Sequence, residues 1–398
     1  MPRDEHRKER NLSAAGARLR RELPWETVCL VLQGGGALGS YQAGVYEGLD
    51  EAGIWPNWVA GISIGALNSA IIAGNPPETR VRRLREFWDY ICRPAVSIPT
   101  NDMLRAVIEP LGGEVRRAFN AFEAWRGSVE GQFGFYAPRW PPLAAAGLNV
   151  GTLDASIYDT AGLKSTLESF ADFDRINDGG MRVSVGAVNV HTGNFAYFDN
   201  TRIRLRPEHF MASGALPPAF PAVEIDGEFY WDGGLVSNTP LYEVLSAVPR
   251  RDTLVFQVDL WSALGVLPIS LFEVQARIKD IQYSSRTRMV TTLFAHDQHY
   301  RRVLRELIDR LPEGSCDGDD WCREARELSC GKRYSVIQLI YRDKEWEGLS
   351  KDYEFGPLTM REHWSSGLDD IRASLVHDDW LDFPAGGEEF ASHDFRRG

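Results

Sequence analysis

The chain of 398 residues lacks any apolar run long enough to cross a bilayer. A membrane-spanning helix needs roughly 20 consecutive apolar residues, and no stretch of the sequence approaches that length. Residues 1–22 carry seven basic and four acidic side chains and no apolar segment, so they do not have the pattern of a secretory signal peptide. We expect residues 1–24 to form a disordered basic tail in front of the folded protein.

Basic charge is also in the minority. The sequence has 44 Lys and Arg against 56 Asp and Glu, which gives a net charge of −12. Binding to nucleic acid phosphates needs a net basic face, so nucleic acid is excluded as a main partner. Hydrophobic residues make up 43% and charged residues 25% of the chain, as in ordinary soluble globular proteins. Global disorder and a fibrous fold are therefore excluded as well.

Cysteine is scarce, with five residues in the whole chain. Cys29 lies in an apolar run, where a buried thiol behaves as a small hydrophobic group. Cys316, Cys322 and Cys330 do not have metal-binding spacing and have no histidine near them. We interpret these three as reduced thiols in a surface loop, with a Cys316–Cys322 disulfide as the alternative. The sequence thus predicts a cytoplasmic protein, and it indicates neither a cofactor nor a metal.

Short apolar runs alternate with helical periodicity in the first part of the chain. Residues 27–33 and 58–62 are continuous apolar runs typical of buried parallel strands. A helical pattern follows each run, and the two patterns end at Gly53 and Gly74. This alternation predicts an α/β fold with a mainly parallel sheet. Further strands are predicted at residues 181–188, 195–198, 253–258 and 335–340, and a long helical region is predicted at residues 269–311.

A G-x-S-x-G motif at residues 61–65 lies between the second strand and its helix. A nucleophile elbow occupies that position, because a sharp strand-to-helix turn exposes the serine, here Ser63. The flanking glycines allow the helix and the neighbouring strand to crowd the turn. An ordinary glycine-rich connection is the alternative interpretation of this motif alone.

A glycine cluster, Gly34-Gly35-Gly36, follows the first strand and opens its helix. Consecutive glycines let backbone N–H groups point at an anion. A dinucleotide pyrophosphate would need an acidic residue at the end of the second strand, and residues 52–62 contain none. The other candidate anion is the oxyanion that forms beside an attacking serine. A glycine loop next to Ser63 is well placed for that role.

Asp232 is the strongest candidate for a base, because it is followed by two glycines that leave its carboxylate free of neighbouring bulk. Taken alone, such an Asp-Gly-Gly sequence is often just a turn. No histidine after Asp232 stands in a small-residue turn, as a catalytic triad would favour. His296 and His299 are more typical of a solvated helix face than of a metal pair. The histidines available by order are His296, His299, His363, His377 and His393.

Four motifs in this order resemble the patatin-like phospholipases. They are Gly-Gly-Gly-Ala-Leu-Gly at 34–39, Gly-Ile-Ser-Ile-Gly-Ala-Leu-Asn at 61–68, Ala-Ser-Gly-Ala-Leu-Pro-Pro-Ala-Phe at 212–220 and Asp-Gly-Gly-Leu-Val-Ser-Asn-Thr-Pro-Leu at 232–241. The resemblance implies a three-layer α/β/α fold, with Ser63 as the nucleophile and Asp232 as the base. It also implies that Gly34, Gly35 and Gly36 form the oxyanion loop. One departure is that Ala37 and Leu38 stand where many members carry Arg or Lys.

The resemblance covers about residues 27–261, and we expect residues 25–265 to form the catalytic domain. Residues 266–398 look like an extension found on some bacterial patatin-like proteins, mixed in helix and strand and packed on the catalytic domain. We expect its strand around Ile337 to extend the main sheet.

The implied function is a serine acyl-ester hydrolase that uses a Ser-Asp dyad and forms an acyl-enzyme. Its substrate would be an acyl lipid, such as a phospholipid or lysophospholipid, or another ester. An intracellular esterase, a polyester depolymerase and a catalytically idle lipid- or protein-binding scaffold are the alternatives. Transient contact with a membrane surface or lipid granule is expected, and homo-oligomer formation stays open.

Aromatic residues are abundant, with 12 Trp, 13 Tyr and 19 Phe. Seven of them lie in residues 119–140, among Gly and Pro and without a regular period. We therefore interpret residues 95–150 as a long aromatic-rich insertion and not as a core element. The aromatic residues either fill a second small core or form a lid or interfacial surface that admits acyl chains.

Overall fold

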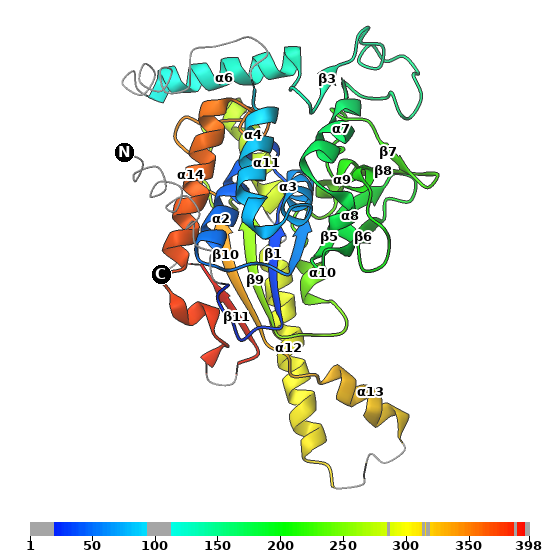
Figure 1. The fold of residues 1–398 in the computed structure, drawn as a ribbon, viewed down its shortest axis with the longest axis vertical. Coiled ribbons are helices and arrows are strands. Elements are labelled where there is room, and N and C mark those ends of the chain that lie inside the picture. The colour runs from blue at the N-terminus through cyan, green and yellow to red at the C-terminus, as the bar shows by residue number, and fades with distance from the viewer. Residues whose placement is uncertain are drawn as a thin grey trace, which may run out of the picture.

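The computed structural model describes residues 20–93, 113–284, 287–312, 315, 319–385 and 388–394. A nine-stranded sheet lies at its centre, with helices on both faces (Figure 1). From one edge to the other its strands are β11 (Phe390–His393), β10 (Tyr334–Ile340), β9 (Thr253–Asp259), β1 (Thr27–Leu32), β2 (Trp58–Gly61), β5 (Arg182–Asn189), β8 (Glu228–Asp232) and β7 (Val223–Ile225), and β6 (Phe195–Asp199) also pairs with β5. The first six strands in this order are parallel to one another, and β5 pairs antiparallel with β6 and β8. The predicted α/β fold with a mainly parallel sheet is confirmed.

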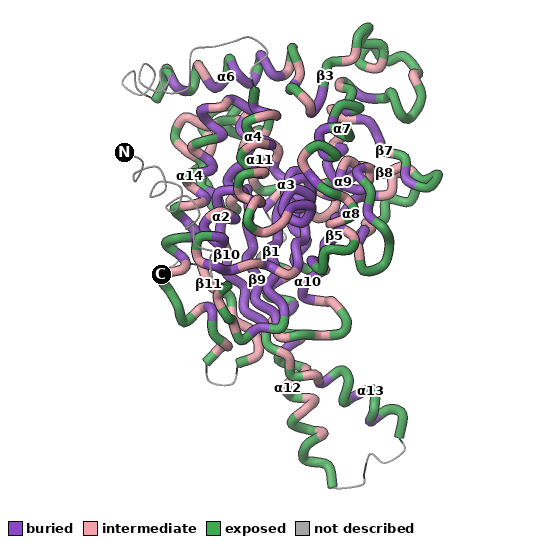
Figure 2. The backbone as a smooth tube through the Cα atoms, in the orientation of Figure 1, coloured by how far each residue is buried: buried purple, intermediate pink, exposed green. Residues whose placement is uncertain are grey.

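Each face of the sheet carries its own hydrophobic core. Leu30 and Leu32 of β1 face one side, whereas Cys29 and Val31 face the other. The first core packs against α2 (Ser40–Glu51), α3 (Ile64–Ala73), α4 (Arg80–Ile91) and α14 (Pro357–Ser374), and the second against α10 (Leu241–Leu245) and α12 (Thr287–Asp309). Burial on both faces explains why these strands are continuous apolar runs in the sequence. Figure 2 shows the buried backbone concentrated in the sheet and in α2 and α3.

The remaining elements lie around this core. They are α6 (Gly113–Glu130), β3 (Ala137–Pro138), β4 (Tyr158–Asp159), α7 (Ala161–Phe170), α8 (Phe173–Asp178), α9 (Pro207–Ser213), α11 (Leu271–Ser284) and α13 (Asp320–Leu328), with short 3-10 turns at Gly36–Gly39, Pro77–Thr79, Gly233–Leu235 and Asp378–Leu381. The lower part of α12 projects with α13 away from the sheet (Figure 1). Within the described residues, no helix combines the length and the apolarity that crossing a membrane requires.

The C-terminal region contributes to the main sheet. Strand β10 pairs in parallel with β9 along its whole length, as expected for the strand around Ile337. Helix α14 lies against α2 at very close range, and glycines make this approach feasible. A Cβ atom added to Gly367 would lie 2.0 Å from the carbonyl oxygen of Tyr41, and one added to Gly44 would lie 1.9 Å from that of Trp364. The two helix backbones therefore touch where neither has a side chain.

The interpretation of residues 119–147 as aperiodic is wrong for their first part, which belongs to the 18-residue helix α6. Its buried side chains are mostly polar, whereas its aromatic side chains Phe122 and Trp125 are exposed. A search for an apolar helical stripe therefore could not detect it. The buried polar positions are Arg116, Asn120, Glu123 and Arg126. Residues 94–112 of the insertion, and residues 1–19 of the expected tail, lie outside the described residues.

The expectation of reduced thiols in the cysteine-rich loop is also wrong at one position. Cys322 is disulfide-bonded, whereas Cys29, Cys92 and Cys330 are free. Cys316 lies outside the described residues. Disulfide formation depends on the distance and direction of two Cβ atoms, and sequence spacing does not contain that information.

Gly367 offers a direct test of the packing between α2 and α14. We expect Gly367→Ala to lower the free energy of unfolding by roughly 3 kcal/mol, because the new methyl group overlaps the Tyr41 carbonyl oxygen. Gly162→Ala, in α7, is the control, since no atom lies within 4 Å of its new Cβ. That variant should be more stable than the parent by up to about 1 kcal/mol. Urea unfolding of the variants measures both changes, and equal effects at the two sites would contradict the close approach.

Candidate active site

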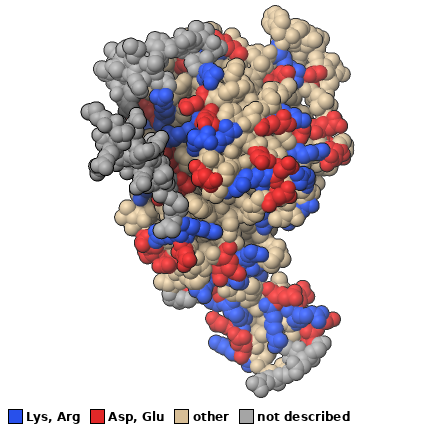
Figure 3. All heavy atoms as spheres, in the orientation of Figure 1, with Lys and Arg blue, Asp and Glu red and all other residues tan. Residues whose placement is uncertain are grey.

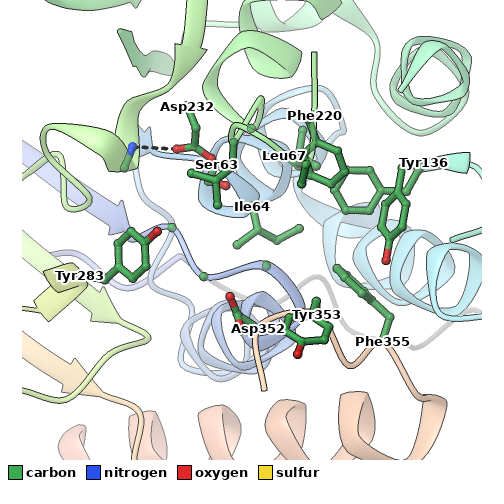
Figure 4. A pocket seen from close by; sticks show the side chains of 18 of the residues that line it. Ser63, Ile64, Leu67, Tyr136, Phe220, Asp232, Tyr283, Asp352, Tyr353 and Phe355 are labelled. Atoms are coloured by element: carbon green, nitrogen blue, oxygen red, sulfur yellow. Dashed lines mark hydrogen bonds between the residues drawn. The ribbon is translucent and has the colours of Figure 1, made fainter. Parts of the chain in front are cut away.

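The register of three strands brings the predicted nucleophile and base together. Strand β6 occupies one edge of β5, so β2 and β8 share the other edge. Strand β2 runs parallel to β5 and ends at Gly61, opposite Val185. Strand β8 runs antiparallel to β5 and ends at Asp232, opposite Ala187. The two strands thus end head to head, and Ser63 and Asp232 lie side by side (Figure 4).

Ser63 sits at a strained turn between β2 and α3. Its φ of 54° is one of two positive values at non-glycine residues in the described chain, and such strain costs about 1–3 kcal/mol. A Cβ atom at Gly61 would lie 2.3 Å from the carbonyl oxygen of Gly65, and one at Gly65 would lie 2.3 Å from that of Leu32. Both glycines of the G-x-S-x-G motif are therefore needed because no side chain fits at either position, as expected for a nucleophile elbow.

Ser213, at the end of α9, fastens this turn to the sheet. The backbone N–H of Ser63 donates to the Ser213 hydroxyl at 3.0 Å, and that hydroxyl donates to the carbonyl oxygen of Gly186 at 2.7 Å. The second residue of the Ala-Ser-Gly-Ala-Leu-Pro-Pro-Ala-Phe motif thus holds the strained backbone in place. A sequence motif identified this segment but not what its serine does.

Asp232 is a buried carboxylate that faces Ser63. One carboxylate oxygen accepts a hydrogen bond from the N–H of Gly234 at 2.7 Å. Burial raises the pKa of Asp232 to about 7, although the hydrogen bonds from Ser63 and Gly234 lower it. At neutral pH the group can therefore accept and return a proton, as a general base must.

The glycine loop lies against Ser63, and its three N–H groups differ. The N–H of Gly34 donates to the carbonyl oxygen of Asn238 at 3.1 Å, so it is already used. The carbonyl oxygen of Gly34 accepts from Asn238 Nδ2 at 2.9 Å and from Trp261 Nε1 at 2.8 Å. In the described part of the chain, the N–H groups of Gly35 and Gly36 have no protein acceptor. These two donors remain for an anion.

All five predicted site residues line one cavity of about 320 Å³. Most of its wall is aliphatic or aromatic (Figure 4), which suits an apolar ligand group. The apolar wall includes Ile64, Leu67, Phe135, Tyr136, Tyr158, Leu216, Phe220, Tyr283, Tyr353 and Phe355. None of the five histidines considered from the sequence lines it. Sequence reasoning missed Tyr283 and the C-terminal segment 352–355, because neither carries a motif that reveals its position.

The aromatic side chains of the insertion differ in their exposure. Phe135 and Tyr136 are buried beside the cavity, and the Phe135 ring lies 5.7 Å from that of Phe355. Trp125 and Trp140 are instead exposed, with Trp140 at 89% of its full accessibility. The insertion thus supplies part of the cavity wall and also an exposed aromatic surface.

Among the described residues, no group of three or more His, Cys, Asp or Glu side chains is arranged to hold a metal ion. The cavity brings together a serine, a buried carboxylate, two backbone donors and an apolar wall. Such a set is able to activate a hydroxyl, stabilise an oxyanion and accommodate an apolar group.

Known proteins are similar to short parts of this chain. Lysophospholipase nte1 of Aspergillus terreus is 52% identical over 107 residues, which cover 24% of this chain and 7% of that protein. Patatin-like phospholipase domain-containing protein 6 of Homo sapiens is 39% identical over 72 residues, which cover 18% of this chain and 5% of that protein. The chain thus spans only a small part of these curated relatives.

Among solved structures, VipD from Legionella pneumophila is similar with a TM-score of 0.39 and 14% identity, over 94% of this chain and 72% of that one. A family described as Patatin phospholipase matches residues 281–386. The family described as Patatin-like phospholipase matches residues 30–245, which is more than half of the chain. This protein therefore belongs to the patatin-like phospholipase family.

Proposed function

We propose that the protein is a serine hydrolase that cleaves carboxylic esters of acyl lipids. The observation that carries the proposal is the pairing of Ser63, at a strained elbow, with the buried Asp232, whose pKa is about 7. The apolar cavity beside them and the membership of the family support a lipid substrate. A phospholipid or lysophospholipid is the substrate class that we infer.

In the proposed mechanism, the ionised Asp232 accepts the proton of the Ser63 hydroxyl while Ser63 Oγ attacks the ester carbonyl carbon. The negative charge that develops on the carbonyl oxygen is bound by the N–H groups of Gly35 and Gly36. The tetrahedral intermediate expels the alcohol, which takes the proton from Asp232, and leaves an acyl-enzyme. Water then attacks the acyl carbonyl carbon and gives a proton to Asp232. Ser63 Oγ leaves, takes that proton back from Asp232, and the fatty acid is released.

We also propose that two regions of the chain contribute different parts of the site. Residues 25–265 carry the dyad and the oxyanion loop, and residues 266–398 complete the cavity as an extension packed on them. Tyr353 and Phe355 support this proposal, because both line the cavity from the C-terminal region.

We further propose that the insertion makes transient contact with a lipid surface. Residues 140–153 contain no charged side chain, and Trp140, Leu143 and Leu148 are exposed. Elsewhere on the face in Figure 3 acidic and basic side chains are interspersed, whereas the upper right end of the molecule is largely uncharged. Exposed Trp and Leu side chains without charge suit the boundary between water and acyl chains.

The dyad can be tested with two variants of nearly unchanged volume. We expect Ser63→Ala and Asp232→Asn to lower the turnover of short and long acyl esters by about 10⁴-fold or more. A fluorophosphonate probe should label the parent protein at Ser63 and neither variant. An active Asn variant would indicate another base. A parent protein that neither hydrolyses esters nor takes the label would favour the idle scaffold.

The raised pKa of Asp232 predicts a pH dependence of the rate. Because only the ionised carboxylate accepts the serine proton, kcat/KM on a soluble ester should rise tenfold per pH unit and level off above about pH 7. A profile that levels off near pH 4 would contradict a buried base.

The same raised pKa predicts that the ionised Asp232 lowers the free energy of unfolding at alkaline pH. Its folded pKa lies above the unfolded value of 3.8, so the folded state binds the proton more tightly and loses stability as the pH rises from about 4 to 7. At pH 8, Asp232→Asn should therefore be more stable than the parent by up to about 4 kcal/mol. Urea unfolding at pH 4 and pH 8 measures the difference, which should nearly vanish at pH 4.

The exposed insertion surface predicts a defect that is specific to vesicles. We expect Trp140→Asp and Leu148→Asp to lower hydrolysis of phospholipid vesicles about tenfold and to leave hydrolysis of a soluble short-chain ester unchanged. Val376→Asp is the matched control, since Val376 is 79% exposed and far along the chain in the C-terminal region. Equal losses on both substrates would indicate a packing role for the insertion instead.

A further inference from the structure

The glycine loop meets the C-terminal region at the backbone of one residue. The N–H of Ala37 donates to the carbonyl oxygen of Asp352 at 2.8 Å. A Cβ atom at Gly36 would lie 2.0 Å from the same oxygen, and the φ of Gly36 is +55°. Because Gly36 and Ala37 both touch this carbonyl group, its position determines where the N–H of Gly36 points.

Ion pairs hold Asp352 in place from its other side. Lys279 Nζ lies 2.8 and 2.9 Å from the two carboxylate oxygens of Asp352 and donates to the carbonyl oxygen of Leu349 at 3.2 Å. The neighbouring Lys351 contacts Asp280 at 2.7 Å and Asp343 at 2.5 Å. We call these five charged residues, Lys279, Asp280, Asp343, Lys351 and Asp352, the ion-pair cage. It connects α11 to the segment between β10 and α14.

Lys351 is the buried centre of the cage, with only 3% of its side chain exposed. Burial lowers its pKa, but Asp343 and Asp280 more than offset this and raise the pKa above its usual value, so Lys351 stays charged. Its ammonium group also lies 4.8 Å from the centre of the Trp261 ring, whose Nε1 holds the carbonyl oxygen of Gly34. The cage therefore contacts the glycine loop directly through Asp352 and reaches its other end through Trp261.

We propose that the ion-pair cage is the positioning device of the oxyanion loop. Oxyanion donors act only when they are aligned before charge develops, and in this proposal the buried ion pairs of the cage hold that alignment. The proposal rests on the proposed hydrolase function, because the alignment of Gly35 and Gly36 matters only if an oxyanion forms there.

Lys279→Met tests the proposal while it leaves Lys351 paired. Lys279 is 28% exposed in its side chain, so its removal spares the buried centre of the cage. We expect kcat for a soluble ester to fall about tenfold with KM unchanged, which is less than the loss of a whole oxyanion donor. Affinity for an alkyl trifluoromethyl ketone, which forms a tetrahedral anion on Ser63, should fall by a similar factor. Lys279→Arg should restore most of both.

Lys332→Met is the matched control. Lys332 is 32% exposed and lies 2.6 Å from Glu26, at the opposite ends of the strands from the glycine loop. This variant also loses an ion pair, but its kcat and its affinity for the ketone should equal those of the parent. If Lys279→Met matches the parent in both quantities, the positioning role is overturned.

Hydrogen exchange separates this proposal from the proposed function. In Lys279→Met, the peptide that contains residues 34–38 should exchange faster than in the parent and in Lys332→Met, because the Ala37 N–H loses a fixed acceptor. Unchanged exchange would overturn the positioning proposal even if the protein hydrolyses no ester. A parent protein that is unlabelled at Ser63 and inactive would overturn the proposed function, whatever the exchange of the loop.

Discussion

The sharing of one edge of β5 by two strands of opposite direction is the constraint on which the site depends. Each strand has only two edges for hydrogen bonding, and β6 occupies one of them over most of the length of β5. Strands β2 and β8 must therefore divide the other edge and stop where they meet. Asp232 is the last residue of β8 at that meeting point, and Ser63 lies two residues beyond the end of β2. Their proximity is a property of the sheet register, which no loop flexibility can easily disturb.

The structure accepts two local penalties at this point. Ser63 adopts a backbone conformation that residues other than glycine avoid. Asp232 is buried, and within the described part of the chain no cation lowers its pKa. Hydrogen bonds hold both residues in these conformations. The Ser63 N–H donates to the Ser213 hydroxyl, and the Gly234 N–H donates to the Asp232 carboxylate. A strained serine and a buried carboxylate that line the same apolar cavity are typical of an enzyme active site.

The sequence predicts those parts of the site that depend on residues close together along the chain. Gly61 and Gly65 are needed for a turn within five residues, so the motif alone indicates it. The strands were predictable because both of their faces are buried, which makes them uniformly apolar. Helix α6 was not predictable, because its buried face is polar. Its Arg116 donates hydrogen bonds to Thr359 and Glu362 of α14, which lie far along the chain. The contact of Asp352 with Ala37 uses a backbone carbonyl group, which any residue possesses and no sequence pattern identifies.

The order of the strands along the chain has a consequence for biosynthesis. Strand β9 is fully buried and mostly apolar, yet its partner β10 is synthesised only after α11, α12 and α13. A chain that emerges from its N-terminus therefore presents β9 as an open edge with a full row of unpaired N–H and C=O groups. Such an edge is a template for wrong pairing with another chain until β10 arrives. Because the last third of the chain completes the sheet, the protein is exposed to aggregation during its own translation.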